Sequence, residues 1–103
     1  MASPERNIRV LVIDDEESIR RALKSILSLR NYDVSLSSSG EEGINLAIET
    51  NPEIVILDLS LPDMDGLDVC RELRTWMTSP ILILSVRGNE GDKVTALDLG
   101  ADD

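Results

Sequence analysis

The chain has 103 residues, enough for one packed domain and too few for two, and its formal net charge of −10 opposes binding to nucleic acid phosphates or anionic lipid. Histidine is absent, which excludes Ser-His-Asp and Cys-His nucleophile pairs and histidine zinc sites, and the single cysteine, Cys70, cannot form an internal disulfide. The longest aliphatic runs have four residues, against the ~20 that a membrane helix needs, so we expect a cytoplasmic domain without membrane contact.

Short β-branched runs, each bounded by polar or turn-forming residues, predict four strands. In chain order they are Ile8–Ile13, Val34–Leu36, Ile54–Leu57 and Ile81–Leu84. Apolar residues at helical spacing follow each run and predict four helices. The spaced sets are Ile19, Ala22, Leu23, Ile26 and Leu27; Ile44, Ala47 and Ile48; Leu67, Cys70 and Leu73; and Val94 and Leu97.

Polar residues mark where these helices begin and end. Ser39 and Glu42 form a capping box for the second helix, and Gly100 suits a left-handed stop for the fourth. Asp15 is a candidate N-cap for the first helix, with Glu16 and Glu17 favourable to its dipole.

Strictly alternating strands and helices predict parallel strands joined by right-handed crossovers. The first and third strands are uninterrupted apolar runs, as expected of central strands covered on both faces. The sequence therefore predicts an α/β fold with an open, doubly wound parallel sheet, in which ligands bind beyond the carboxyl ends of the strands.

Acidic residues stand at those carboxyl ends. The first strand runs into Asp14 and Asp15, the third into Asp58, and the fourth ends at Ser85. Capping is an equally good interpretation of Asp14 and Asp15 alone, but no helical pattern follows Asp58 until about Gly66. Converging carboxylates repel one another unless a cation joins them, and a hard divalent cation such as Mg²⁺ prefers oxygen ligands.

One ordered set of motifs runs through the chain: Asp14-Asp15, Asp58, the segment LPDMDG at 61–66, Ser85, and GADD at 100–103. In this combination they resemble the receiver domain of bacterial two-component response regulators. The resemblance implies a flavodoxin-like strand order of 2-1-3-4, followed in intact receivers by a fifth strand and helix. The segments around 74–76 and 85–98 are further similar to regulators of potassium-transport operons in the winged-helix class.

The resemblance implies a role for each of these positions. Asp58 would be the phosphoryl acceptor, and Asp14 and Asp15 would hold Mg²⁺ together with Asp58 and the backbone carbonyl of Ser60. Ser85 would contact the bound phosphoryl group. The donor would be the phosphohistidine of a sensor histidine kinase, so the domain would be a phosphoacceptor that switches an output surface rather than a turnover enzyme.

Receivers place a lysine at the end of a fifth strand, and this chain ends at Asp103. We therefore expect residues 1–103 to be a receiver truncated at its C-terminus, lacking the fifth strand, the fifth helix and any DNA-binding output domain. Such a fragment would not bind nucleic acid directly. Its exposed fourth strand would favour a homodimer or other self-association, or marginal stability.

Two alternatives belong to other classes of protein. Asp63-Met64-Asp65-Gly66 resembles the motif of haloacid-dehalogenase phosphatases, although there the first aspartate directly ends a strand. The same segment partly matches a calcium loop, but Leu61 occupies its first position, and a turn into the third helix is the simpler interpretation. A phosphorylation-independent interaction module with the receiver fold is the other alternative.

Overall fold

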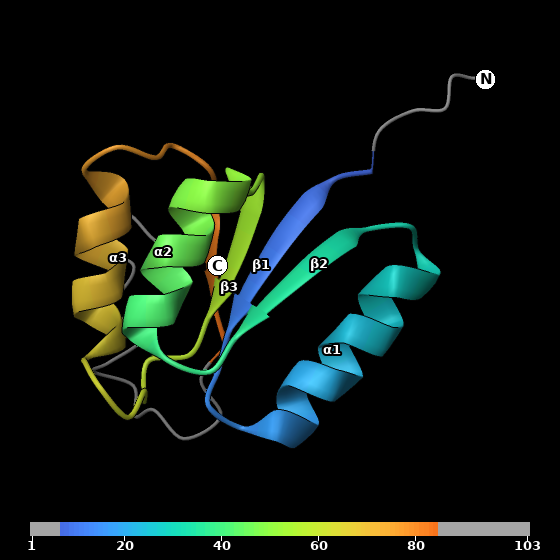
Figure 1. Cartoon of the computed structure of the whole chain (residues 1–103), viewed down its shortest axis with the longest axis horizontal. Coiled ribbons are helices and arrows are strands. Elements are labelled where there is room, and N and C mark those ends of the chain that lie inside the picture. Colours follow the sequence, from blue (N-terminus) through green and yellow to red (C-terminus); the bar gives the residue numbers. More distant parts are fainter. Residues whose placement is uncertain (1–6, 85–103) are drawn as a thin grey trace.

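A computed structural model describes residues 7–84, and its elements follow the predicted order (Figure 1). The strands are β1 (Arg9–Ile13), β2 (Asp33–Ser37), β3 (Ile54–Leu57) and β4 (Ile81–Ile83), and the helices are α1 (Glu17–Leu29), α2 (Gly40–Thr50) and α3 (Gly66–Arg74). Each predicted strand is present, with ends displaced by at most one residue. The helix predicted around Val94 and Leu97, its stop at Gly100 and Ser85 lie outside the described residues.

The four strands form one parallel sheet in the order β2-β1-β3-β4, which confirms the predicted topology. The register sets Ile13 of β1 beside Ser37 of β2 and Leu57 of β3. Three strands therefore end at the same level, and the residues that follow them meet at one edge of the sheet.

The two faces of the sheet are covered differently. Helices α2 and α3 lie on one side and α1 lies on the other (Figure 1). The side of α2 and α3 holds the continuous core, made of Leu11, Ile13, Ala47, Val55, Leu57, Leu59, Val69, Cys70, Leu73, Met77 and Ile81. No residue of α1 is buried, and Ile26 and Leu29 of that helix are 55% and 84% exposed.

Two predicted caps have different outcomes. Ser39 is the N-cap of α2, and its side chain accepts a hydrogen bond from the Glu42 N–H, as predicted. The interpretation of Asp15 as the cap of α1 is wrong, because the N-cap is Glu16, without a side-chain cap bond. The Glu16 N–H instead donates to Oδ1 of Asp14 at 2.9 Å, a local bond between a side chain and the backbone two residues on.

The described residues contain no helix that is both long enough and apolar enough to cross a membrane. The longest helix described, α1, has 13 residues and carries charged side chains along its length.

Candidate functional site

The sheet fixes the backbones of two acidic residues side by side. Asp14 follows β1, and its N–H donates to the Ser37 carbonyl of β2 at 3.0 Å. Asp58 follows β3, and its N–H donates to the Ile13 carbonyl of β1 at 2.9 Å. Both are buried, at 3% and 4% exposure, because they continue central strands. Their positions therefore follow from strand pairing and do not depend on a flexible loop.

Asp15 completes a set of three carboxylates with Asp14 and Asp58, which we call the acidic cluster. One oxygen from each residue lies within 4.8 Å of the others. Opposite oxygens around an octahedral Mg²⁺ are about 4.2 Å apart, twice the usual metal–oxygen distance. The donor set is all oxygen and carries up to three negative charges, so these residues fit a hard divalent cation. The predicted convergence of the three aspartates is confirmed.

In the metal-free acidic cluster, a negative charge on Asp14 is unfavourable. Burial raises the pKa of Asp14, and the nearby charges of Asp58, Asp15 and Glu16 raise it further. The hydrogen bond from the Glu16 N–H opposes this change, because it stabilises the ionised carboxylate. Without a cation, ionisation of Asp14 is therefore unfavourable relative to an exposed aspartate, and a bound cation would reverse that balance.

The loop between β3 and α3, which follows Asp58, is tightly turned. The Ser60 N–H donates to Oδ1 of Asp58 at 3.2 Å, and Ser60 forms an isolated antiparallel bridge with Asp65. At Gly66 a Cβ atom would lie 2.5 Å from the Leu59 Cα and 2.7 Å from the Asp58 carbonyl oxygen. Only a residue without a side chain lets α3 start this close to the end of β3.

Asp63 and Asp65, the loop aspartates, both act as helix caps. Asp63 accepts hydrogen bonds from the Gly40 and Glu41 N–H groups of α2, and Asp65 accepts one from the Leu67 N–H of α3. The bonds from the Glu41 and Gly40 N–H groups lower the pKa of Asp63. The segment is a turn leading into α3, and its carboxylates are engaged in the fold, unlike the catalytic pair of a phosphatase.

Among the other predicted site residues, Ser60 lies on the rim of the acidic cluster and is exposed, while Ser85 lies outside the described residues. Arg20 belongs to α1, which covers the side of the sheet opposite to α2 and α3 (Figure 1), and it contacts the backbone of Asp14. Its Nη1 donates to the Asp14 carbonyl at 2.8 Å, so it stabilises the turn after β1.

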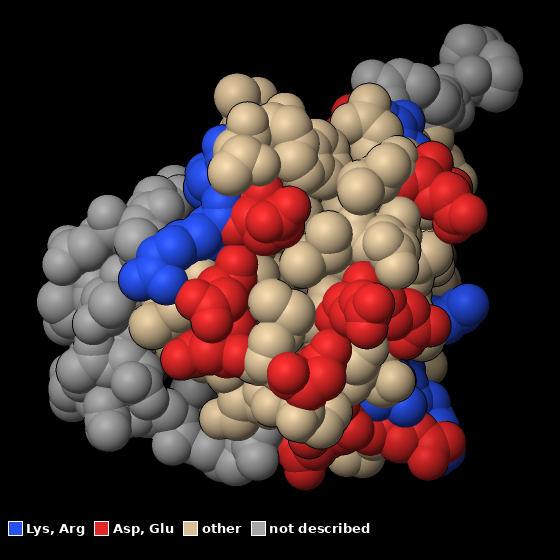
Figure 2. Space-filling view, turned by 60° about the vertical axis from the view of Figure 1, so that its left-hand side comes forward, with Lys and Arg blue, Asp and Glu red and all other residues tan. Residues whose placement is uncertain are grey.

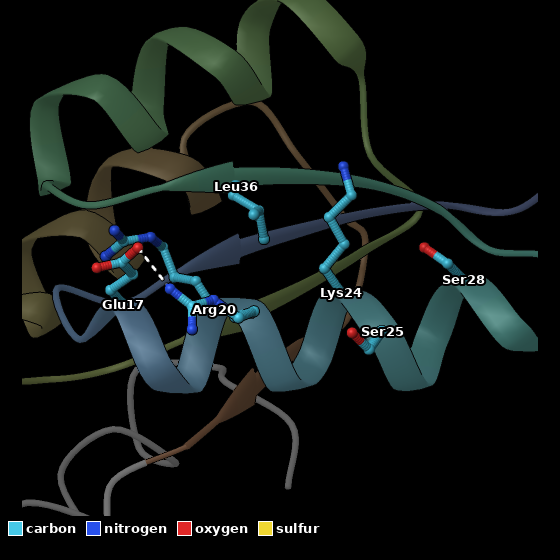
Figure 3. A pocket seen from close by; sticks show the side chains of 7 residues that line it. Glu17, Arg20, Lys24, Ser25, Ser28 and Leu36 are labelled. Atoms are coloured by element: carbon cyan, nitrogen blue, oxygen red, sulfur yellow. Dashed lines mark hydrogen bonds and ion pairs between the residues drawn. The ribbon is translucent and has the colours of Figure 1, made fainter.

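An open pocket of about 490 Å³ lies between α1 and β2, and none of the three aspartates of the acidic cluster lines it (Figure 3). It is lined by Glu17, Arg20, Arg21, Lys24, Ser25, Ser28 and Leu36. Glu17 and Arg21, one turn apart on α1, form an ion pair at 2.8 Å. On the side of α2 and α3, acidic side chains are spread among other residues without forming one patch (Figure 2).

The second cap on α2, from the Asp63 carboxylate, was not predicted. Asp63 lies 23 positions from Gly40 in the chain, and a carboxylate that caps a distant helix leaves no local pattern. The bond from Arg20 to the Asp14 carbonyl was also missed, although a basic residue one turn into a helix that follows an acidic turn is a usable signal.

The model of the response regulator receiver domain family matches residues 10–103. The chain is 53% identical over 94 residues to the transcriptional regulatory protein KdpE of Mycobacterium tuberculosis, covering 91% of this chain and 42% of that protein. A probable transcriptional regulator, ycf27 of Guillardia theta, is 44% identical over 99 residues, covering 96% of this chain and 39% of that protein. The KdpE match agrees with the narrower resemblance drawn from the sequence.

Solved receiver domains share the fold. The BeF3-activated N-terminal receiver domain of Klebsiella pneumoniae RstA superposes with a TM-score of 0.85 at 25% identity, covering 90% of this chain and 80% of that one. The response regulator domain of Thermotoga maritima CheB gives a TM-score of 0.85 at 30% identity, covering 95% and 76%. The chain spans about two fifths of the length of the curated relatives that it matches.

Proposed function

The chain belongs to the response regulator receiver domain family, and from this premise we propose that Asp58 accepts a phosphoryl group in a Mg²⁺-dependent reaction. The observation that carries the proposal is the acidic cluster, in which the buried Asp58 lies beside two further carboxylates at the carboxyl edge of the sheet. A receiver of this kind is a signalling domain, not a turnover enzyme.

Asp14, Asp15 and Asp58 would hold the metal, with the Ser60 carbonyl as a further ligand. Bound Mg²⁺ would neutralise charge on the transferring phosphoryl oxygens. An ionised carboxylate needs no general base, which suits a chain without histidine. A carboxylate oxygen of Asp58 would attack phosphorus as the phosphorus–nitrogen bond of a phosphohistidine breaks, and the released imidazole would take a proton from water.

The donor in this proposal is a sensor histidine kinase. The matched relatives are transcriptional regulators more than twice as long as the matched region, so we propose that this domain controls a separate output domain in the cytoplasm. DNA contact would belong to that output domain, since the net charge of −10 opposes it here. Ser85 would contact the bound phosphoryl group, as the family resemblance implies.

Self-association is a further part of the proposal. Among the described residues, β4 pairs only with β3, and Leu82 and Ile83 are half-buried. An open edge strand can pair with a second copy. Sedimentation velocity across a range of protein concentrations tests this part separately from phosphorylation.

Labelling with a small-molecule phosphodonor and Mg²⁺ tests the central claim. We expect one phosphoryl group per chain, stable to acid and labile to base, which Asp58→Asn abolishes. Asp65→Asn is the matched control, because Asp65 is exposed and caps α3, and its labelling should equal wild type. Continuous phosphate release from the donor would support a phosphatase, and no labelling would support a phosphorylation-independent module.

A further inference from the structure

The tip of the loop between β3 and α3 is bound to the start of α2. Both oxygens of the Asp63 carboxylate are used: Oδ1 accepts from the Gly40 N–H at 2.8 Å and Oδ2 from the Glu41 N–H at 2.9 Å. Met64 packs beside the same helix start, where a Cβ on Gly40 would overlap its Cγ and Sδ atoms. The bare backbone of Gly40 thus allows the loop to come close enough for both bonds.

This contact supplies more than a cap for α2. Ser39 already accepts from the Glu42 N–H, so α2 has a cap of its own within its sequence. Helices leave four N–H groups without internal partners, and Asp63 takes two that Ser39 does not reach. A carboxylate from a distant loop therefore fixes that loop to a helix start that already has a cap from Ser39.

The segment that joins β2 to α2 is also bound to Asp14 of the acidic cluster. We call residues 37–41 the α2 cap segment. Its first residue, Ser37, accepts a hydrogen bond from the Asp14 N–H at 3.0 Å, while its last two residues donate to Asp63. One short segment therefore contacts the backbone of Asp14 and the loop that follows Asp58.

Strand pairing fixes Asp58 but not the residues after it. The paired register of β1 and β3 ends at Ile13 and Leu57, the Asp58 N–H donates to the Ile13 carbonyl, and Ser60 lies two residues beyond. The loop closes on itself through the bond from the Gly66 N–H to the Leu59 carbonyl and the bridge between Ser60 and Asp65. Beyond these bonds, the loop is held by the packing of Leu59, Leu61 and Met64 against the core and by the contact of its tip with α2.

We propose that Asp63 is a positioning residue for the metal site, which ties the loop to the α2 cap segment and so holds the Ser60 backbone beside the acidic cluster. This inference rests on the proposed function, because it assigns Asp63 a part in Mg²⁺ binding. Asp63 does not touch the ion; it acts through the backbone of residues 60–62. Supporting contacts of this kind typically change metal affinity by 10–100-fold when removed.

Titration of the full chain with MgCl₂, followed by amide chemical shifts, tests this role. We expect Asp63→Ala to raise the Mg²⁺ dissociation constant about tenfold. Asp63→Asn keeps one acceptor oxygen and should fall between Asp63→Ala and wild type. In metal-free protein, amide hydrogen exchange at Ser60 should be faster in Asp63→Ala than in wild type, a result that does not depend on metal or phosphorylation.

Two controls separate positioning from general effects. Ser39→Ala removes the other cap of α2 and should lower the unfolding midpoint while changing the Mg²⁺ dissociation constant less than about twofold. Glu41→Gln removes one exposed negative charge beside Asp63 and leaves the Glu41 N–H bond intact, so it measures the effect of charge alone.

Each outcome decides a different point. Mg²⁺ binding by Asp63→Ala that equals wild type, or that equals Ser39→Ala, would overturn the positioning role and leave the proposed function standing. If wild type itself binds no Mg²⁺, the proposed function fails and this inference fails with it. Loss of affinity in Glu41→Gln equal to that in Asp63→Asn would assign the effect to charge and overturn the role of the hydrogen bonds.

Discussion

The acidic cluster and the loop aspartates lie at the same edge of the sheet, yet folding has opposite effects on the pKa of Asp14 and the pKa of Asp63. Burial and neighbouring carboxylates raise the pKa of Asp14 in the cluster. Backbone N–H groups of α2 lower the pKa of Asp63 in the loop. The ionised carboxylate of Asp14 thus opposes folding in metal-free protein, whereas the loop aspartates support the fold by capping helices. A cation beside Asp14 would therefore relieve a charge that the fold opposes.

The difference also explains why the sequence pattern DMDG is ambiguous. Two aspartates two positions apart suit a catalytic pair, a metal loop or a turn, and only the partners of each carboxylate separate these alternatives. Here Asp63 faces α2 and Asp65 faces α3, so both contribute to structure. The residue type alone carries no such information.

The largest effect is expected where the two groups meet, at Gly66. Gly66→Ala would place a Cβ against the backbone of Leu59 and Asp58, which cannot move without displacing the end of β3. We expect a loss of about 2–3 kcal/mol in unfolding free energy, measured by chemical denaturation, together with weaker Mg²⁺ binding.

Gly43→Ala is the matched control for that prediction. Its Cβ would meet side-chain atoms of Ile13 and no backbone atom among its nearest neighbours, and alanine favours a helix interior by about 1 kcal/mol over glycine. Its loss should therefore be smaller. Equal losses in the two variants would show that the start of α3 has room to move and that the loop aspartates are not rigidly placed against Asp58.

Much of this arrangement follows from sequence, because strand order and the acids at strand ends depend on local patterns. The run from Arg9 to Asp15 predicts a buried strand ending in carboxylates, and pairing then brings Asp58 beside them. How closely each helix packs against the sheet was less predictable. The apolar spacing of α1 predicts a packed helix, but Ile26 is 55% exposed, because spacing shows which face is apolar and not what lies against it.

A smaller effect is expected from removing one charge in each group. Asp14→Asn keeps the acceptor for the Glu16 N–H and removes an unfavourable buried charge, so metal-free protein at neutral pH should gain about 1 kcal/mol of stability. Asp65→Asn keeps the cap on α3, since asparagine and aspartate cap equally well, and should change stability by less than about 0.5 kcal/mol.

The stabilities of Asp14→Asn and Asp65→Asn should respond differently to Mg²⁺. Excess metal should stabilise wild type and Asp65→Asn alike and stabilise Asp14→Asn less, because that variant lacks one ligand charge. Unfolding midpoints with and without MgCl₂ measure both effects. A loss of stability in metal-free Asp14→Asn would contradict the view that the fold opposes the charge of Asp14.

The smallest effect is a dependence on pH with opposite sign for the two groups, measured in metal-free buffer. Because folding raises the pKa of Asp14 above 3.8, the folded state keeps its proton over a range in which the unfolded state loses it. The stability of wild type relative to Asp14→Asn should therefore fall as pH rises above 3.8.

For Asp63 the change in stability occurs at pH values below 3.8. Folding lowers its pKa below 3.8, so its contribution is present above that pH and is lost as pH falls through the folded value. Relative to Asp63→Asn, wild type should lose its advantage in acid, whereas relative to Asp14→Asn it should gain there. Unfolding free energies of all three proteins between pH 2 and 7 measure both trends. Parallel curves would mean that one environment acts on both carboxylates, and the distinction between cluster and caps would then have no electrostatic basis.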